Sequence, residues 1–298
     1  MASYRGVDRY FVLSQESTWN TFDSGASTVL WPIGVGDDGA SMMQDSGQNV
    51  LETNVGHGIP YYVNTGISSF TGTLNCVVDE TLGVDLVKWG SLITSSALPT
   101  YSLDIGGGES YERWTGLTVE SMSLTSGSDS GAQRLTAAIS VVGGGYSQPE
   151  SGEIVEVQAN YSPATGFMHS QCELSFDGSD NTTVRDLTIN FANVLDIGNG
   201  TGTEPSYIQF CGRQVTLDCT IEYDSDAFRA GFVAQPPTNF TLFAKYDTGS
   251  SDLTMHMQSA CKVTAFTPVN SLGARATANI SLLATSPTAP TTADFTVS

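Results

Sequence analysis

The chain has 298 residues, with 11 Lys and Arg against 31 Asp and Glu, and a formal net charge of −20. The cations stand singly between Arg5 and Arg275, so the basic stripe that binding to a phosphate backbone requires is missing, which excludes tight nucleic-acid binding. Charged residues make up 14% of the chain, and Thr, Ser, Val and Gly are abundant, which favours strands joined by turns. The acidity allows two explanations, plain solubility or a surface that must repel nucleic acid.

The expected compartment is the cytosol. No stretch near the N-terminus has the apolar length of a signal peptide, and no run elsewhere could span a bilayer. Five cysteines without C-x-x-C spacing fit reduced thiols in that compartment.

The first half of the chain predicts strands around one short helix. A strand over 27–33 ends at the glycine-rich turn 34–39, and a polar extended stretch over 41–50 leads into a long connection at 52–66. After a strand that begins at Phe70, an acidic cap and apolar residues at helical spacing predict a helix over 79–89. Further strands follow at 101–103, at 117–124 and at 134–142.

Four blocks of this pattern recur later in the chain, in the same order and with apolar residues replaced by apolar ones. The pairs are 49–52 with 193–196, Pro60 and Tyr62 with Pro205 and Tyr207, 73–76 with 216–219, and 134–142 with 275–283. Thr73 and Thr216 open the best-matched block, at an offset of 143 positions. Duplication of one domain explains this order better than shared β-propensity does.

The duplication predicts a mainly β protein with two tandem homologous domains of β-sandwich or barrel-like form, each with one short flanking α-helix. The second helix is expected over 224–232. The predicted boundaries are a first domain at 1–146, a linker rich in Gly, Ser, Pro and Glu at 147–165, a second domain at 166–286 and a C-terminal tail at 287–298. Domains of this size can each bury a core of their own.

Two long connections, 52–66 and 196–212, occupy equivalent positions in the copies and carry aromatic residues. Long loops in small domains are usually functional, so we expect contact arms, with a disordered tip as the alternative for the glycine-rich parts. The candidate contact residues are Val50, Leu51, Tyr61, Tyr62, Val194, Leu195, Tyr207 and Phe210.

Motifs for cofactors and metals do not hold up. Residues 34–39 fit G-x-G-x-x-G after a strand, but no helix opens there and two aspartates stand where a pyrophosphate would lie. Residues 177–181 resemble a calcium loop without its glycine and distal glutamate. His57, His169 and His256 are far apart in sequence, so we predict no metal site and no cofactor.

An aspartic protease would share the size, the acidity and the two homologous lobes. Asp-Ser-Gly begins at Asp23, Asp45 and Asp129, all in the first copy, whereas Asp247 begins the one D-[ST]-G of the second copy. The counterpart of Asp247 is the triple-glycine turn 106–108, so the symmetric pair of aspartates that such an enzyme needs is missing. We predict no catalytic residues and no enzymatic activity.

The arrangement of the matched blocks resembles the major tail tube protein of long-tailed, siphovirus-type phages, in the branch whose tube domain is duplicated within one chain. The resemblance covers residues 10–284, and order and duplication make it specific rather than any single motif. The blocks that carry it are 15–19, 72–86, 111–122 and 134–142 in the first copy, and 184–189, 215–232 and 275–283 in the second.

The resemblance implies a structural virion protein. Homotrimers would form pseudo-hexameric rings in which strands of neighbouring domains join, and the rings would stack into the hollow tail tube that delivers genomic DNA. The two arms would reach the adjacent ring. The implied partners are further copies of the chain, other tail proteins at the tube ends, and DNA that passes the lumen without sequence-specific binding; no membrane is implied.

The implied location is the virion tail, after synthesis and assembly in the host cytoplasm. We expect acidic and small polar side chains in the lumen, because a negative wall repels phosphate; the alternative is a near-neutral lumen with the acid outside.

Two other classes stay open. A carbohydrate-binding or adhesive β-sandwich would use exposed aromatic platforms, but Trp19, Trp31, Trp89 and Trp114 all belong to the first copy, so a duplicated sugar site is not supported. A duplicated acidic hydrolase would need a paired acid and base, which the sequence does not offer.

Overall fold

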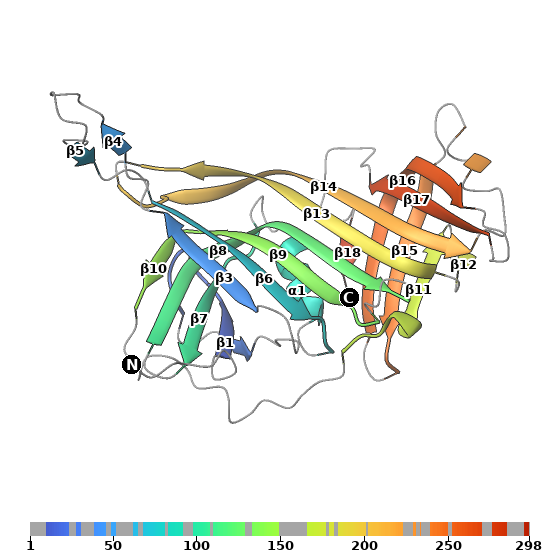
Figure 1. Ribbon diagram of the computed structural model, residues 1–298, viewed down its shortest axis with the longest axis horizontal. Helices are drawn as coiled ribbons and strands as arrows, with labels where there is room; N and C mark the ends of the chain where they lie inside the picture. The colour runs from blue at the N-terminus through green and yellow to red at the C-terminus, as the bar shows by residue number, and fades with distance from the viewer. Residues whose placement is uncertain are drawn as a thin grey trace.

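A computed structural model of the chain gives the fold. It describes residues 10–23, 28–30, 39–45, 49–51, 62–64, 68–80, 83–91, 98–107, 110–128, 133–148, 166–176, 179–181, 184–200, 202–222, 229–230, 233, 239–249, 252–269, 276–284 and 295–297. Antiparallel strands make up most of this, which confirms the mainly β class (Figure 1).

The first half is built around one long strand that belongs to two sheets. Its elements are β1 (Tyr10–Gln15), β2 (Thr28–Leu30), β3 (Ala40–Asp45), β4 (Asn49–Leu51), β5 (Tyr62–Asn64), β6 (Ser69–Val77), α1 (Gly83–Ser91), β7 (Tyr101–Gly107), β8 (Ser110–Gly127), β9 (Thr136–Gly143) and β10 (Gly145–Ser147). Paired neighbours follow the order β2-β1-β7-β8-β9-β6-β3. The start of β8 pairs with β7 and β10, and its end pairs with β9, with a shift in register between Val119 and Ser121.

The second half follows the same order of pairing. Its elements are η3 (His169–Gln171), β11 (Cys172–Phe176), β12 (Ser179–Asn181), β13 (Val184–Gly198), β14 (Tyr207–Glu222), β15 (Asn239–Asp247), β16 (Asp252–Val269), β17 (Thr277–Ala284) and β18 (Phe295–Val297). The neighbours run β12-β11-β15-β16-β17-β14-β13, and β18 pairs with β16 as β10 pairs with β8. The long strand β16 also shifts register where it passes from β15 to β17, between Val263 and Ala265.

Residues that the matched sequence blocks equate do not have equivalent pairing partners in the two halves. Leu74 lies opposite Ile139, but in the second half Cys219 lies opposite Ile280, while Leu217 lies opposite Leu282. Relative to the final strand of its own half, the block 216–219 is thus displaced by two residues compared with the block 73–76. Because side chains alternate between the faces of a strand, a displacement of two keeps the same residues on the core side.

Apolar side chains at alternate strand positions and on one face of α1 form the core. Leu86 and Trp89, three residues apart on α1, are both buried and confirm the apolar face expected for that helix. The helix begins at Gly83 rather than at residue 79, because the backbone of Asp79 bridges to Gly166. Of the second predicted helix, only Arg229 and its neighbour lie within the described residues, and both are helical.

Segments from the second half of the chain also pack against the first. The N–H of Phe167 donates to the carbonyl of Val78 at 3.0 Å, and the N–H of Leu135 donates to the carbonyl of Phe167 at 2.8 Å. The Phe167 ring is buried. At the other end of the chain, β18 pairs with Met255 to Met257 of β16, so part of the predicted C-terminal tail belongs to a sheet.

Candidate assembly surfaces

The two halves are joined by backbone pairing into one continuous sheet. Strand β13 lies antiparallel to the end of β8, from Asp186 opposite Gly127 to Ala192 opposite Ser121. On the core side of this junction Leu187, Ile189 and Phe191 are buried. The end of β8 is therefore a sheet edge that accepts a strand from another domain-sized unit (Figure 1).

A chain of buried polar groups crosses the same junction. The hydroxyl of Ser126 in β8 lies 2.8 Å from the Tyr246 hydroxyl and 3.0 Å from His169 Nδ1. His169 Nε2 lies 2.9 Å from the carbonyl of Val184, which can only accept, so Nε2 donates this hydrogen bond. The Ser126 hydroxyl thus links β15 of the second half to the His169 ring through two hydrogen bonds.

Among the strand edges that have no neighbour within the described part of the chain, two are relevant to assembly. Strand β3 pairs there with β6 alone, and β16 beyond Lys262 pairs with β17 alone. Each edge carries a large exposed apolar side chain, Met43 on β3 at 59% and Val269 on β16 at 42% exposure. Unpaired edges with exposed apolar residues are typical of surfaces that pair with another chain.

The face of the sheet that points away from the core is lined by small polar side chains. We call it the polar face; its residues alternate along each strand with buried apolar ones. They are Ser69, Thr71, Thr73, Asn75, Ser121, Ser123, Thr125, Thr136, Ala138, Ser140, Asp186, Thr188, Asn190, Thr216, Asp218, Thr220, Thr277, Asn279 and Ser281. Neighbouring strands are linked across it, since Ser281 Oγ donates to Asp218 Oδ1 at 2.5 Å and Thr220 Oγ1 donates to Asn279 Oδ1 at 3.0 Å.

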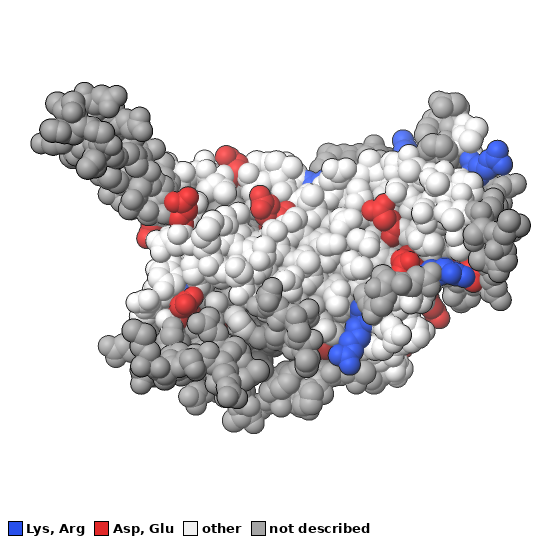
Figure 2. All heavy atoms as spheres, viewed as in Figure 1, with Lys and Arg blue, Asp and Glu red and all other residues white. Residues whose placement is uncertain are grey.

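Charge is sparse on this face. Among the residues just listed, Asp186 and Asp218 are acidic and none is Lys or Arg. On the side of the molecule drawn in Figure 2, the described acidic side chains also stand apart from one another in a mostly neutral surface. The hydroxyl groups, rather than carboxylates, set the character of the polar face.

The second predicted arm is a β-hairpin rather than a long loop. Strand β13 continues to Gly198 and β14 starts at Tyr207, directly opposite, with an irregularity that leaves Cys211 as the extra residue. The Ser206 N–H closes the turn by donating to the carbonyl of Gly198 at 2.8 Å. The alternation of apolar and polar residues ends at Phe191, but the pairing of β13 with β14 continues to Gly198, so the segment forms a hairpin.

The candidate contact residues of the second arm differ in exposure. Val194 and Tyr207 are exposed, at 61% and 47%, whereas Leu195 and Phe210 are half-buried. In the first arm, Val50 and Leu51 in β4 pair with β5, where Tyr62 lies opposite Leu51, while Tyr61 falls outside the described residues. The two sets belong to separate hairpins.

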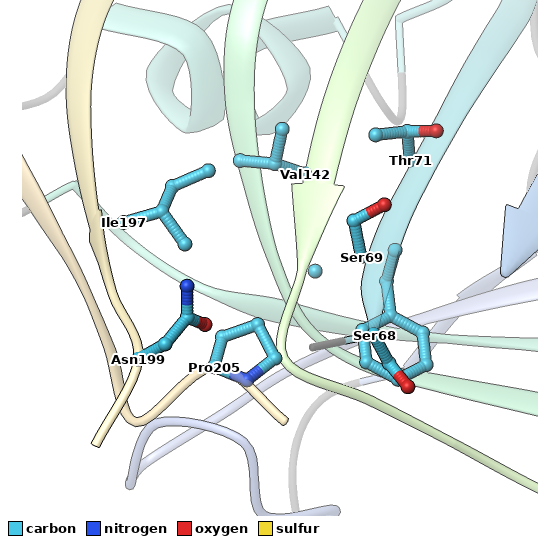
Figure 3. Close-up of a pocket in the computed structure, with 9 residues that line it drawn as sticks. Ser68, Ser69, Thr71, Val142, Ile197, Asn199 and Pro205 are labelled. Atoms are coloured by element: carbon cyan, nitrogen blue, oxygen red, sulfur yellow. The ribbon is translucent and has the colours of Figure 1, made fainter. Parts of the chain in front are cut away.

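The second arm lies against the first half near the base of the first arm. The Ser68 N–H donates to the carbonyl of Thr203 at 2.6 Å. Figure 1 shows β13 and β14 continuing toward the β4–β5 hairpin, and a cavity of about 320 Å³ lies beside the contact. Residues on the arm face residues of β6 and β9 across this cavity (Figure 3): Ser68, Ser69, Phe70, Thr71, Val142, Gly143, Ile197, Asn199 and Pro205.

The part of the chain that is described shows neither a metal site nor a helix that could span a membrane. No three His, Cys, Asp or Glu side chains come together there as a metal site would require. No helix within it is long and apolar enough to cross a membrane. All five cysteines are free thiols. Trp89 and Trp114 are buried in the core, so neither offers a platform for a sugar.

Sequence comparison identifies the family. Individually curated proteins yield no match to the chain. The family model described as "Phage tail tube protein" matches residues 6–271, which is most of the chain. A chain of antiparallel sheets and hairpins fits that description, and the chain belongs to the phage tail tube protein family.

Proposed function

We propose that the protein is the tube subunit of a siphovirus-type tail, that its chain holds two copies of one tube domain, and that three chains close a pseudo-hexameric ring. The observation that carries this proposal is the β8·β13 junction, where one half already pairs edge to edge with the other. The common order of strands in the halves supports the duplication. Repeating the same junction between chains gives a closed ring in which the free edges of β3 and β16 are paired.

The junction within the chain supplies a register for the junction between chains. Transferring the β8·β13 register to the free edges sets β3 antiparallel to the end of β16 of the next chain, with Ser41 opposite Val269 and Met43 opposite Thr267. Met43 and Val269 then become diagonal neighbours on one face, within reach of each other. Their exposure in the single chain has its reason in this contact.

In such a ring, the polar face would line the lumen. Its hydroxyls do not offer DNA the clustered cations that hold a phosphate backbone, so genomic DNA would slide through without sequence-specific contact. The chain's net charge of −20 would add repulsion wherever its acids face the lumen. Rings would stack through the arms, end on other tail proteins, and assemble in the host cytoplasm before the tube enters the virion tail.

The test uses the purified chain and charge variants of the two edges. Wild-type protein should form rings or hollow tubes in negative-stain microscopy, and the smallest closed assembly should have the mass of three chains. Met43→Lys with Val269→Lys should prevent closure by like-charge repulsion, and Met43→Lys with Val269→Glu should restore it. Equal assembly of both double variants would overturn the proposed junction. Six chains in a ring would overturn the closure of the ring by three chains.

A further inference from the structure

One buried asparagine makes polar contacts from the second half to two separate elements of the first. Asn193 of β13 is 6% exposed, and its Nδ2 donates to the carbonyl of Val119 at 2.9 Å and to that of Gly90 at 3.3 Å. Val119 stands where β8 shifts register, and Gly90 is in the last turn of α1. Both carbonyls lie where regular structure ends or is interrupted, so they lack part of their regular partners.

The other end of the same amide is held by an arginine of its own hairpin. Arg213 of β14 lies opposite Asn193, and its Nε donates to Asn193 Oδ1 at 2.9 Å. This hydrogen bond fixes which way the amide faces, because the oxygen must meet the guanidinium and the nitrogen must meet the two carbonyls. Burial lowers the pKa of Arg213 to about 10, so the guanidinium keeps its charge at neutral pH.

We propose that Asn193 and Arg213 form a latch that fixes the angle between the two halves of one chain. The pair ties a strand of the second half to the helix end and to the bend of β8, which are the elements that define the orientation of the first half. As an oriented amide in a buried site, Asn193 acts as a positioning residue. A shift of either half would break at least one of its three hydrogen bonds.

The edge between chains has no such latch, a conclusion that rests on the proposed function. Thr71 pairs with Val142 of β9 as Thr216 pairs with Leu283 of β17, so the two threonines are equivalent. Three residues before each threonine stand Ser68 in the first half and Arg213 in the second. The sequence has no Lys or Arg between Arg9 and Lys88, so the first hairpin has no cation to orient an amide. A ring would alternate latched junctions within chains and unlatched junctions between them.

Hydrogen exchange on the monomeric full-length chain tests the latch. In Asn193→Ala, amides of β8 and β13 at the junction should exchange about tenfold faster, since hydrogen bonds that involve a charged group are lost. Amides of β1 and β7, far from the junction, should be unchanged. The matched control is Asn190→Ala on the same strand, because Asn190 is half-buried on the polar face and its Nδ2 reaches only Thr216 Oγ1, at 3.5 Å.

Arg213→Gln is the second variant, for the case that Asn193→Ala fails to fold; it should give the same local increase. Unchanged exchange at the junction, or an equal increase in every strand, would overturn the latch and leave an ordinary core residue. The measurement needs no rings. A wild-type chain that never polymerises would sink the proposed function alone, and tubes that form with unaltered exchange in both variants would sink the latch alone.

Discussion

Tyr246 of β15 and Ser126 of β8 share a hydrogen bond of 2.8 Å between the two halves of the chain, and both side chains are buried. Tyr246→Phe removes the phenol hydroxyl and leaves the Ser126 hydroxyl with one partner fewer. We expect a loss of about 1 to 2 kcal/mol in the free energy of unfolding, measured by urea denaturation. Ser128→Ala, which removes an exposed hydroxyl of the same strand end, is the control and should cost far less. Equal losses in the two variants would contradict this role for the hydrogen bond.

The buried thiols predict a loss of stability in alkali. Burial raises the pKa of Cys219 and of Cys261 from 9.0 to about 12. In the unfolded chain these groups lose their proton above pH 9, whereas the folded chain keeps it, so stability falls as the pH rises from 9 toward 12. At pH 10.5 the loss should be about 2 kcal/mol for each thiol.

Urea midpoints at the two ends of this range measure the effect. Cys261→Ala should be less stable at pH 8 because of its cavity but should lose less between pH 8 and pH 10.5. Cys211→Ser, at an exposed thiol, should show the same alkaline loss as the wild type. A midpoint that does not move with pH would rule out the linkage.

The first half contains a buried ion pair between β7 and β8. Arg113 Nε and Nη2 donate to the two carboxylate oxygens of Asp104 at 2.7 and 2.8 Å, and the guanidinium lies 3.4 Å from the centroid of the Phe22 ring.

Breaking this pair should cost much more than replacing it. Asp104→Ala leaves Arg113 buried without its carboxylate and should destabilise the chain by about 3 to 5 kcal/mol. The double variant Asp104→Ala with Arg113→Met replaces both charged partners with apolar side chains and should recover most of the loss. Guanidinium denaturation of the monomers decides this, and a double variant no more stable than the single one would refute it.

The arms should govern stacking rather than ring closure. Replacing Tyr61, Tyr62 and Tyr207 by Ser removes aromatic surface that we propose is buried between rings. Single rings should persist while tubes become at least several times shorter in electron micrographs. Gln209→Ser, at an exposed position of the same hairpin, is the control. Tubes of normal length from the triple variant would show that stacking uses other surfaces.

Cations placed on the polar face should hold DNA in the tube. Tubes of Thr71→Lys with Thr188→Lys should retain a short duplex at low salt and release it at high salt, because retention depends on counterion release. Wild-type tubes and tubes of Glu173→Lys, a change at an exposed residue outside the polar face, should retain none. Retention by Glu173→Lys alone would mean that DNA binds elsewhere than on the polar face.

The alternation of polar and apolar residues was enough to predict the β class and most strands, because each strand buries one face. It did not predict the junction between the halves, since the backbone groups of Ser121 to Gly127 pair with β13 without any side-chain signature. Nor did it distinguish the second arm from a loop, because the pairing of Gly198 with Tyr207 depends on a hairpin register that spacing alone does not fix.

Local signals also lost to tertiary contacts. Asp79 has the chemistry of a helix cap, but its backbone bridges to Gly166 and the helix starts four positions later. Asn193 belongs to the recurring block 193–196, which does not predict its role, and its three partners come from β8, α1 and β14. Contacts between elements so distant in sequence leave no periodic trace in a single chain.

The junction between β8 and β13 forms within one molecule, and this has a kinetic consequence for the proposed ring. Half of the six joints in a three-chain ring would be made during folding, at an effective concentration that does not change when the protein is diluted. The equilibrium amount of closed ring would then depend on the third power of the chain concentration. If the six domains were separate chains, it would depend on the sixth power of their concentration. A duplicated chain could thus close rings early in infection, while subunits are still scarce.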